Sequence, residues 1–361
     1  QAPEPGTGPR QAAPDPARMS RPGGWYEADT RFIPGHYQPA TLIDLALSRD
    51  IDSHRLLRGT GLFYEDILAG TTCVSPQQFF SLIGNARRLL DADDSSFLFG
   101  QRLLPGHYGP ASHALQQAPN LHQALETVIH HRALLSPLLT PRLVLDDHYA
   151  YVYWLDSSGA QEHARFVLEA SMTALLAMSR WLSGERLPWE CRFSHAEPRY
   201  VEQYWVHLGE NSQFGCQLDM MRIPRECLTR PWPNASAIAR QVALQHAQRE
   251  LDSLGFSASL LDRVYVYLRH NAHHAPSLEL TAQTLGMSQA TLKRKLSKHG
   301  THFQAQQDQA RKHMALYLYQ IKGMSNEDVA RYLNFSDPAN FRRSLKRWTG
   351  CTPNLIRQLF S

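Results

Sequence analysis

The sequence predicts an α+β N-terminal domain followed by an all-α domain that carries two helix-turn-helix units. Three observations support this fold class. The last hundred residues contain one local pattern twice, and each copy fits two short helices joined by a tight turn. Upstream, the spacing of hydrophobic residues changes from helical to alternating near position 143. The cations are unevenly distributed, since every Lys of the chain lies at or after position 293.

Residues 1–24 are expected to form a disordered leader. This stretch is rich in Pro, Ala and Gly, lacks the apolar segment of a signal peptide, and contains Met19 as a candidate natural start. No apolar run in the chain approaches the ~20 residues that a membrane span requires. The five Cys have no paired metal-ligand spacing, and their odd number argues against a disulfide framework. We therefore expect a cytoplasmic protein without membrane contact, metal or other cofactor.

Residues 25–234 show helical patterns followed by strand patterns, which predicts an α+β domain. Ser75 before Pro76 and Asn120 before Leu121 are candidate N-caps of two helices. Alternating residues on both sides of a polar turn at 146–148 then predict a β-hairpin. The remaining expected elements are a helix over 161–182, strands over 190–194 and 213–223, a helix over 200–208, and a helix within 235–256 that links the two domains.

Three tyrosines on one face of the predicted hairpin are candidates for a small-molecule site. Tyr149, Tyr151 and Tyr153 alternate with smaller or apolar residues, so they share one side of the strand. Met172 and Trp181 come from the helix that follows. Walls rich in aromatic residues and Met suit an apolar or amphipathic effector, and they suit an ordinary core equally well. The sequence leaves both interpretations open.

The first helix-turn-helix copy begins near Ala282. A small residue there lets the two helices approach closely, and Gly286 can turn the chain because it enters the left-handed region without steric cost. Ser288 then stands at the N-cap position of the second helix. The apolar residues of that helix recur four apart, which turns its basic residues outward. The inward positions are Leu292 and Leu296, and the outward ones are Lys293, Arg294, Lys295 and Lys298.

The second copy repeats the pattern from Ala330 onward. Asn334 stands where Gly would be expected, and Asn is the non-Gly residue that best tolerates the left-handed conformation. Ser336 is the candidate N-cap of the following helix, with Pro338 near its start. The inward positions of this helix are Phe341 and Leu345, and the outward ones are Arg342, Arg343, Lys346 and Arg347.

Residues 301–321 predict one continuous helix between the two copies, because the segment contains no Gly or Pro and has apolar residues at helical spacing. At about 1.5 Å per residue this helix spans ~30 Å. That length is close to the ~34 Å between successive major-groove faces of DNA. A rigid spacer of this kind would let one chain read two grooves.

Charge supports a polyanion-binding surface in the C-terminal part. Residues 258–361 contain 15 Lys and Arg but 6 Asp and Glu, a balance of +9. The rest of the chain contains 22 and 27, a balance of −5. Because charge and motif coincide in the same segment, we expect nucleic-acid binding there.

Several short motifs lie within residues 258–361. They are Leu285-Gly286-Met287-Ser288, Leu292-Lys293-Arg294-Lys295-Leu296, Arg311, Ala330, Phe335-Ser336-Asp337-Pro338, Phe341, Lys346-Arg347-Trp348-Thr349-Gly350-Cys351-Thr352-Pro353 and Arg357. Together they resemble the DNA-binding domain of the AraC/XylS family of bacterial transcription regulators. Upstream, Asn211-Ser212-Gln213-Phe214 leads to Arg222-Ile223-Pro224. That pattern is similar to the arabinose-binding-type sensor domain of the family's ornithine-utilisation-regulator-like branch.

The resemblance implies a sequence-specific regulator that binds double-stranded DNA, contacts RNA polymerase and forms a homodimer. It also implies control by a small-molecule effector bound to the N-terminal domain, without identifying the effector. In the family pattern, Lys293, Arg294 and Arg343 match base-reading or backbone-contacting positions. The full set of expected DNA-contacting residues is Gln289, Ala290, Thr291, Lys293, Arg294, Lys298, Ala339, Asn340, Arg342, Arg343 and Lys346.

Two alternatives remain open at this point. The N-terminal domain could serve only dimerisation or protein docking, without an effector. More distantly, it could be an enzyme fused to a DNA-binding module. The sequence contains no nucleophile elbow, phosphate-binding Gly-rich loop or zinc-type His-Glu helix motif. The doublets His130-His131 and His273-His274 lack the spacing of four that a helical metal pair needs. We therefore expect no catalytic residue.

Overall fold

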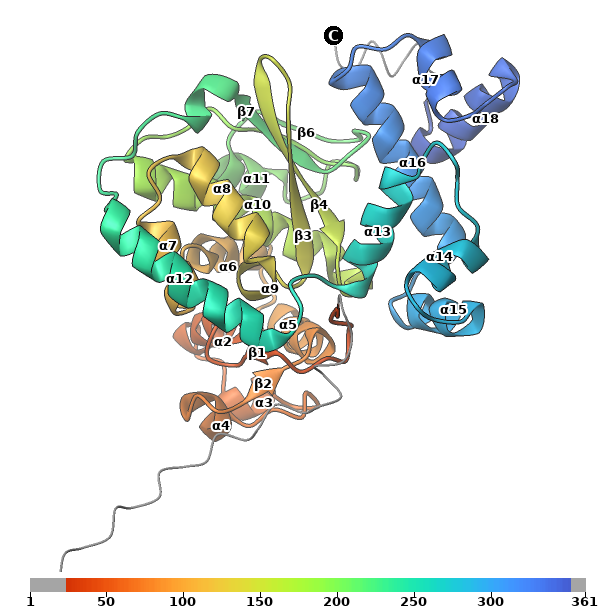
Figure 1. Ribbon diagram of the computed structural model, residues 1–361. Coiled ribbons are helices and arrows are strands. Elements are labelled where there is room, and N and C mark those ends of the chain that lie inside the picture. Colours follow the sequence, from red (N-terminus) through yellow and green to blue (C-terminus); the bar gives the residue numbers. More distant parts are fainter. Residues whose placement is uncertain (1–23, 352–361) are drawn as a thin grey trace, which may run out of the picture.

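The computed structural model describes residues 24–351 and confirms the predicted fold class. A unit of helices with a five-stranded sheet is followed by a set of helices that starts at α13 (Leu260–His270) and extends away from the sheet (Figure 1). The expected leader lies outside the described residues except for Gly24. Thr352, Pro353 and Arg357 of the C-terminal motif also lie outside them.

Local sequence determines where the longer helices of the N-terminal unit begin. The Ser75 hydroxyl accepts a hydrogen bond from the Gln78 N–H, and the Gln78 side chain accepts one from the Ser75 N–H. This capping box starts α5, and the Asn120 side chain caps α8 by accepting from the Gln123 N–H, so both predicted caps are confirmed. The helices of this part are α2 (Gln38–Ser48), α3 (Ser53–Leu56), α4 (Tyr64–Leu68), α5 (Pro76–Leu90), α6 (Ser95–Leu103), α7 (Pro110–Gln116), α8 (Leu121–His130), α9 (Arg132–Leu135), α10 (Ala164–Ser183) and α11 (Val201–Leu208).

A five-stranded sheet with the order β3-β4-β7-β5-β6 forms the centre of the molecule. The pair β3–β4 is the predicted hairpin, and only β5–β6 is parallel among the described strand pairs. Side chains of β4 alternate, so Val152 and Trp154 enter the core shared with α10, whereas Tyr151 and Tyr153 face the opposite side. The strands are β3 (Leu139–Leu145), β4 (Tyr149–Asp156), β5 (Glu190–Arg192), β6 (Ser212–Gln213) and β7 (Met220–Pro224), and a separate pair is formed by β1 (Ile33–Pro34) and β2 (Cys73–Val74).

The prediction of one continuous strand over 213–223 is wrong. The chain forms β6, leaves the sheet, and returns as β7. Gly215 has a φ of +66°, which breaks the extended conformation. The next residue, Cys216, donates its N–H to the Phe193 carbonyl in the loop after β5. The intervening loop therefore leads from the edge strand β6 past β5 to β7.

The helix expected within 235–256 is α12 (Ala237–Leu254). The Ser236 side chain caps its start, and Gly255, with a φ of +78°, ends it. Arg240 fixes this helix to the N-terminal unit, since its guanidinium donates to the Ala114 carbonyl at 2.8 Å and to the Thr127 hydroxyl at 2.9 Å. Helix α12 is therefore packed against the N-terminal unit along its length (Figure 1).

The C-terminal helices contain both predicted helix-turn-helix units. Gly286 and Asn334 have φ values of +75° and +64°, as expected for the two turns. Ser288 caps the first recognition helix by accepting from the Thr291 N–H. Ser336 does not cap the second, because Asp337 accepts from the Ala339 N–H instead and Pro338 takes the first helical position. The helices are α14 (Leu278–Thr284), α15 (Gln289–Lys298), α16 (Phe303–Gln320), α17 (Asn326–Tyr332) and α18 (Pro338–Thr349).

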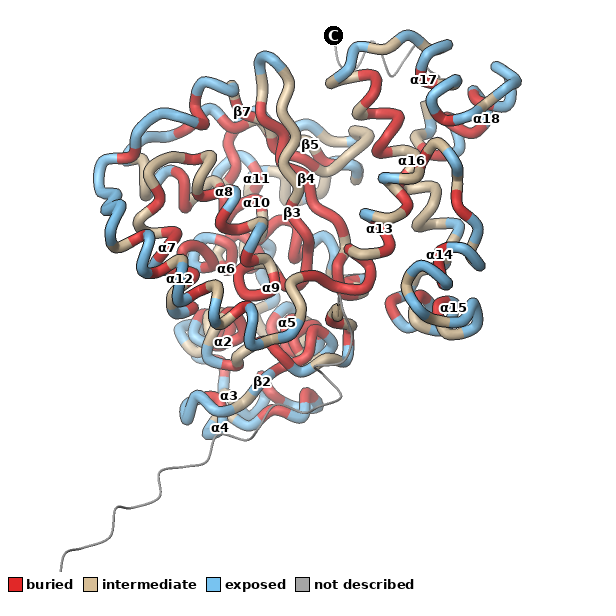
Figure 2. Tube along the Cα trace, in the orientation of Figure 1, coloured by how far each residue is buried: buried red, intermediate tan, exposed pale blue. Residues whose placement is uncertain are grey.

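Helix α13 joins the two parts by covering the second face of the sheet. Tyr151 and Tyr153 of β4 share a hydrophobic cluster with Leu261, Val264 and Leu268 of α13. Figure 2 shows that buried residues continue from the strands into this helix, whereas the outer faces of α15 and α18 are exposed. The sheet is therefore a layer between α10 on one side and the first helix of the C-terminal part on the other.

A buried carboxylate fixes this contact. The Asp262 side chain is 1% exposed and lies between two arginines of the N-terminal unit. Arg132 approaches at 2.8 Å through Nη2 and 2.9 Å through Nε, and Arg142 forms a second ion pair. Ser259 caps the same turn by accepting from the Asp262 N–H. The ion pairs of Asp262 with Arg132 and Arg142 therefore fix where α13 packs against the N-terminal unit.

We expect Asp262→Asn to destabilise the protein by roughly 2–4 kcal/mol, because it removes the negative charge and leaves two partly buried guanidinium groups without a counter-ion. Thermal or urea unfolding measures the change. Asp147→Asn, at an exposed position of the β3–β4 turn, is the matched control and should change stability by less than about 0.5 kcal/mol. Equal effects of the two substitutions would contradict a specific role for Asp262.

Candidate nucleic-acid interface

Two cationic helices lie near opposite ends of α16. The helices α14 and α15 form one unit, and α17 and α18 form the other (Figure 1). In each recognition helix the predicted inward residues are buried, namely Leu292 and Leu296 in α15 and Phe341 and Leu345 in α18. The residues predicted to contact DNA are exposed, except for the half-buried Thr291, and Lys295, which is also predicted to face outward, is half-buried. The exposed residues of the predicted set are Gln289, Ala290, Lys293, Arg294 and Lys298 on α15, and Ala339, Asn340, Arg342, Arg343 and Lys346 on α18.

Contacts from α16 hold the second unit in place. The Arg311 guanidinium donates to the Leu333 carbonyl at 2.7 Å and stacks on Phe335 and Trp348, 4.7 and 5.1 Å from the ring centroids. Asp308 accepts hydrogen bonds from the Trp348 indole and from Arg347, both at 3.1 Å. Arg347 is thus engaged within the protein, which distinguishes it from its neighbours on α18. The sequence motif contains Arg311, but spacing does not reveal this bridging role.

The first recognition helix contacts the N-terminal unit through its basic residues. Glu27 pairs with Lys295 at 2.7 Å and with Lys298 at 2.8 Å, and Asp29 also pairs with Lys298, at 3.0 Å. Burial opposes ionisation of Glu27, but hydrogen bonds from the two lysines prevail and lower its pKa to about 2. Lys298, predicted to contact DNA, therefore has protein partners in this conformation. Nothing in the local sequence indicates a partner 271 residues away.

His299, at the end of α15, completes this contact. Burial lowers its pKa, which favours the neutral ring. The Ala28 N–H donates to Nε2 at 3.0 Å, so Nδ1 carries the proton and donates to the Lys295 carbonyl at 2.7 Å. One neutral histidine thus links the last turn of the helix to the segment before β1.

The five residues expected to line one effector pocket do not come together, which corrects that prediction. Tyr151 and Tyr153 face α13, and Tyr149 packs at the edge of the same cluster. Met172 belongs to the core on the other side of the sheet. Trp181 is 65% exposed near the end of α10. Alternation along β4 correctly groups the tyrosines, but it does not say which helix they face.

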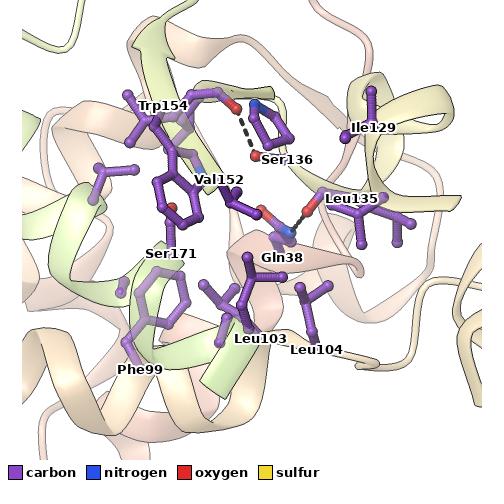
Figure 3. A pocket seen from close by; sticks show the side chains of 18 of the residues that line it. Gln38, Phe99, Leu103, Leu104, Ile129, Leu135, Ser136, Val152, Trp154 and Ser171 are labelled. Carbon is purple, nitrogen blue, oxygen red and sulfur yellow. Dashed lines mark hydrogen bonds between the residues drawn. The ribbon is translucent and has the colours of Figure 1, made fainter. Parts of the chain in front are cut away.

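The core between the sheet and α10 contains a small cavity of about 30 Å³. Its walls are mostly apolar and include Phe99, Leu103, Val152 and Trp154 (Figure 3). Gln38 is one of few polar groups there, and its side chain donates to the Leu135 carbonyl at 2.7 Å. Such a volume holds one or two water molecules at most. The core between the sheet and α10 is therefore largely filled by its own side chains.

A larger cavity of about 270 Å³ lies between the sheet and the C-terminal helices. Tyr151, Tyr153 and Met220 of the sheet form part of one wall, and residues of α13 and α16 form the other. Three polar contacts lie at its margin. Gln320 donates to the Tyr151 hydroxyl at 3.0 Å, and the Tyr265 hydroxyl lies 3.2 Å from that of Tyr153 and 2.9 Å from His313 Nδ1.

The described residues can also be examined for metal ligands and membrane-spanning helices. Across residues 24–351, no group of three or more His, Cys, Asp or Glu is arranged to hold a metal ion. Among the helices in that range, none is long and apolar enough to cross a membrane. The five cysteines are all unpaired, including Cys191 and Cys227 in the core.

Two protein families match the chain. The family described as the arabinose-binding domain of AraC transcription regulator, N-terminal, matches residues 51–232. A helix-turn-helix domain family matches residues 281–358. The first match covers the sheet and most of its helices, and the second covers both recognition helices.

The chain is also similar to individual transcription regulators. The ornithine utilization regulator of Pseudomonas aeruginosa is 27% identical over 329 residues, which is 91% of this chain and 96% of the relative. The HTH-type transcriptional regulator VqsM of the same organism is 29% identical over 139 residues, 38% of this chain and 43% of VqsM. Among solved structures, the regulator CdpR from P. aeruginosa is 19% identical with a TM-score of 0.42, covering 89% of this chain and 98% of CdpR.

We expect Arg294→Ala to weaken DNA binding by about 1–3 kcal/mol and to relax the preference at one or two base pairs, because an outward Arg on a recognition helix pairs best with guanine. Binding to a set of single-base variants of a selected DNA site measures both effects. Arg249→Ala removes an equal charge from the exposed side of α12 and should leave affinity and preference unchanged. A uniform loss across all sequences would mean that Arg294 contacts only phosphate.

On α18, Arg343→Ala is expected to remove protection of one of two neighbouring grooves while the other stays protected, because each recognition helix is positioned by its own turn. Chemical footprinting of the full chain measures this. If the variant protects both grooves with unchanged affinity, the second helix contributes little to DNA binding.

Proposed function

We propose that this chain, which belongs to the AraC family of DNA-binding transcription regulators, reads two successive major-groove faces of DNA with α15 and α18. The observation that carries this proposal is the placement of both recognition helices on one continuous helix. Its 18 residues correspond to roughly 27 Å at 1.5 Å per residue. This length supports simultaneous docking in grooves about one helical turn apart.

The proposed contacts follow from exposure and charge. Lys293 and Arg294 on α15, and Arg342, Arg343 and Lys346 on α18, are exposed cations on the outward faces. We assign base reading to Arg294 and Arg343 and assign phosphate contacts to the remaining cations. The smaller outward residues, which allow close approach of the helix to base edges, are Gln289, Ala290, Thr291, Ala339 and Asn340.

Residues 25–234, with the helix within 235–256, act in this proposal as the unit that controls the DNA-binding domain over 257–361. A small-molecule effector is the favoured control, and the cavity between the two parts supports it. The second candidate is a regulator without effector, whose N-terminal part only dimerises or docks another protein. The filled core between the sheet and α10 favours that candidate.

Homodimerisation, contact with RNA polymerase and a cytoplasmic, nucleoid-associated location complete the proposal. Ile238 and Val242 support self-association, because they lie four residues apart on α12 and are 80% and 46% exposed. We propose no catalytic activity. Nothing in the arrangement of the described residues favours an enzyme over a regulator.

The full chain should bind DNA with a strong salt dependence. If five to seven phosphates are neutralised, a plot of log affinity against log salt has a slope of about −4.5 to −6. Fluorescence anisotropy with a labelled duplex, repeated over a range of salt concentrations, measures this slope. A value shallower than about −2 would contradict a two-helix DNA surface.

A further inference from the structure

The cavity between the sheet and the C-terminal helices has walls from both parts of the chain. Tyr151, Tyr153 and Arg222 belong to β4 and β7, whereas Arg269 belongs to α13 and Tyr317 to α16. The volume of about 270 Å³ exceeds that of the cavity in the core between the sheet and α10, about 30 Å³. A molecule bound here would touch the sheet and the helices that carry the DNA-reading surface at the same time.

Positive charge dominates the lining of this cavity. Arg192, Arg222 and Arg269 contribute guanidinium groups, and the described residues that line the cavity include no Asp or Glu. Glu190, outside the lining, pairs with Arg222. No ion pair to Arg192 or Arg269 occurs within the described part of the chain. Because Arg192 and Arg269 have no anionic partner among the described residues, an anion bound in this cavity would pair with charges that are otherwise unpaired.

Two lining side chains have buried polar atoms without a partner among residues 24–351. They are Arg269, whose Nε lacks an acceptor, and Gln217, whose Oε1 lacks a donor. A buried polar atom left without a hydrogen bond costs free energy, so a small local shift that lets a ligand or water reach either atom would be favourable. The Arg269 guanidinium is oriented by the Tyr317 ring, 5.2 Å from its centroid. One donor is thus held in position at the helical wall.

The remaining walls favour an apolar ligand body. Val144, Leu218, Met220, Leu316 and Ile321 line the cavity together with the rings of the two tyrosines. An inorganic anion would contact the arginines but leave this surface unused. An organic acid can satisfy both, with the acid group toward the guanidinium groups and the carbon skeleton against the apolar side chains.

We infer that this cavity is the effector site and that it binds a small organic carboxylate with an apolar body, held in part by Arg269. The inference rests on the proposed function and deepens it by assigning the place and chemical class of the effector. Because both parts of the chain contact the ligand, its binding depends on how α13 and α16 lie against the sheet. Any preference of DNA for one such arrangement then couples the two sites.

The test measures melting of the full chain with benzoate, phenylacetate and hexanoate, each beside its neutral amide: benzamide, phenylacetamide and hexanamide. An acid at about a hundred times its Kd should raise the Tm by roughly 5 °C, and its amide should raise it less. Arg269→Met keeps the apolar stem and removes the charge, so it should abolish the acid-specific shift. Arg263→Met, on the same helix but outside the cavity lining, is the matched control and should preserve it.

Arg192→Met provides a second variant on the opposite wall and should reduce the shift, which keeps the test valid if Arg269→Met folds poorly. The acid that binds should also change DNA affinity by a factor on the order of five. Equal shifts by acids and amides, or no shift by any acid at about 10 mM, would overturn the inference. So would an acid-specific shift that persists in both arginine variants. DNA binding without any added acid tests the proposed function separately, so the two failures can be distinguished.

Discussion

The carboxylate of Asp262, enclosed by Arg132 and Arg142, determines where the DNA-binding helices lie relative to the sheet. A buried carboxylate with two arginine partners tolerates little displacement. If either ion pair is lost, the remaining contact no longer compensates the desolvation free energy of the carboxylate. Asp262 lies in the first turn of α13, whose apolar face covers the tyrosine side of the sheet. Helix α16 packs on α13 and carries the second unit, so the placement of the later helices follows from this one.

This arrangement makes the sheet a shared wall instead of the interior of one domain. One face belongs to the core with α10, and the other is covered by α13, the first helix of the DNA-binding part. The Glu27, Lys295 and Lys298 cluster adds a second contact, directly on a recognition helix. Together these contacts give the N-terminal unit two physical routes by which it can influence the orientation of α15. Regulation needs such a contact, because a ligand shifts an equilibrium only through differential interactions with its states.

Local signals in the sequence predicted most of the C-terminal architecture. Gly286 and Asn334 adopt the left-handed conformation that the turns require, and leucines four apart identify the buried face of α15. The N-cap of α18 was misassigned because Ser336 and Asp337 are both good caps. Pro338 resolves the choice, since it occupies the first helical position and leaves the cap to the residue before it.

Long-range features could not be predicted in the same way. Alternation groups the tyrosines of β4 on one face, but only the tertiary fold shows that α13, and not α10, covers that face. Apolar and polar residues alternate across 213–223, so the pattern predicts one strand although the chain forms a loop between β6 and β7. Gly215, with its positive φ, is the one local sign of the break. The ion pairs of Lys298 and the role of Asp262 join residues more than a hundred positions apart. Periodicity contains no information about such partners.

The most direct test of the account concerns the rigid spacing of the two recognition helices. A duplex selected from a random pool by the full chain is compared with one in which about five base pairs, roughly half a helical turn, are inserted between the two protected grooves. If α16 holds α15 and α18 at a fixed separation, the insertion should sharply reduce affinity and leave one groove protected. Equal affinity with both grooves still protected would contradict the account.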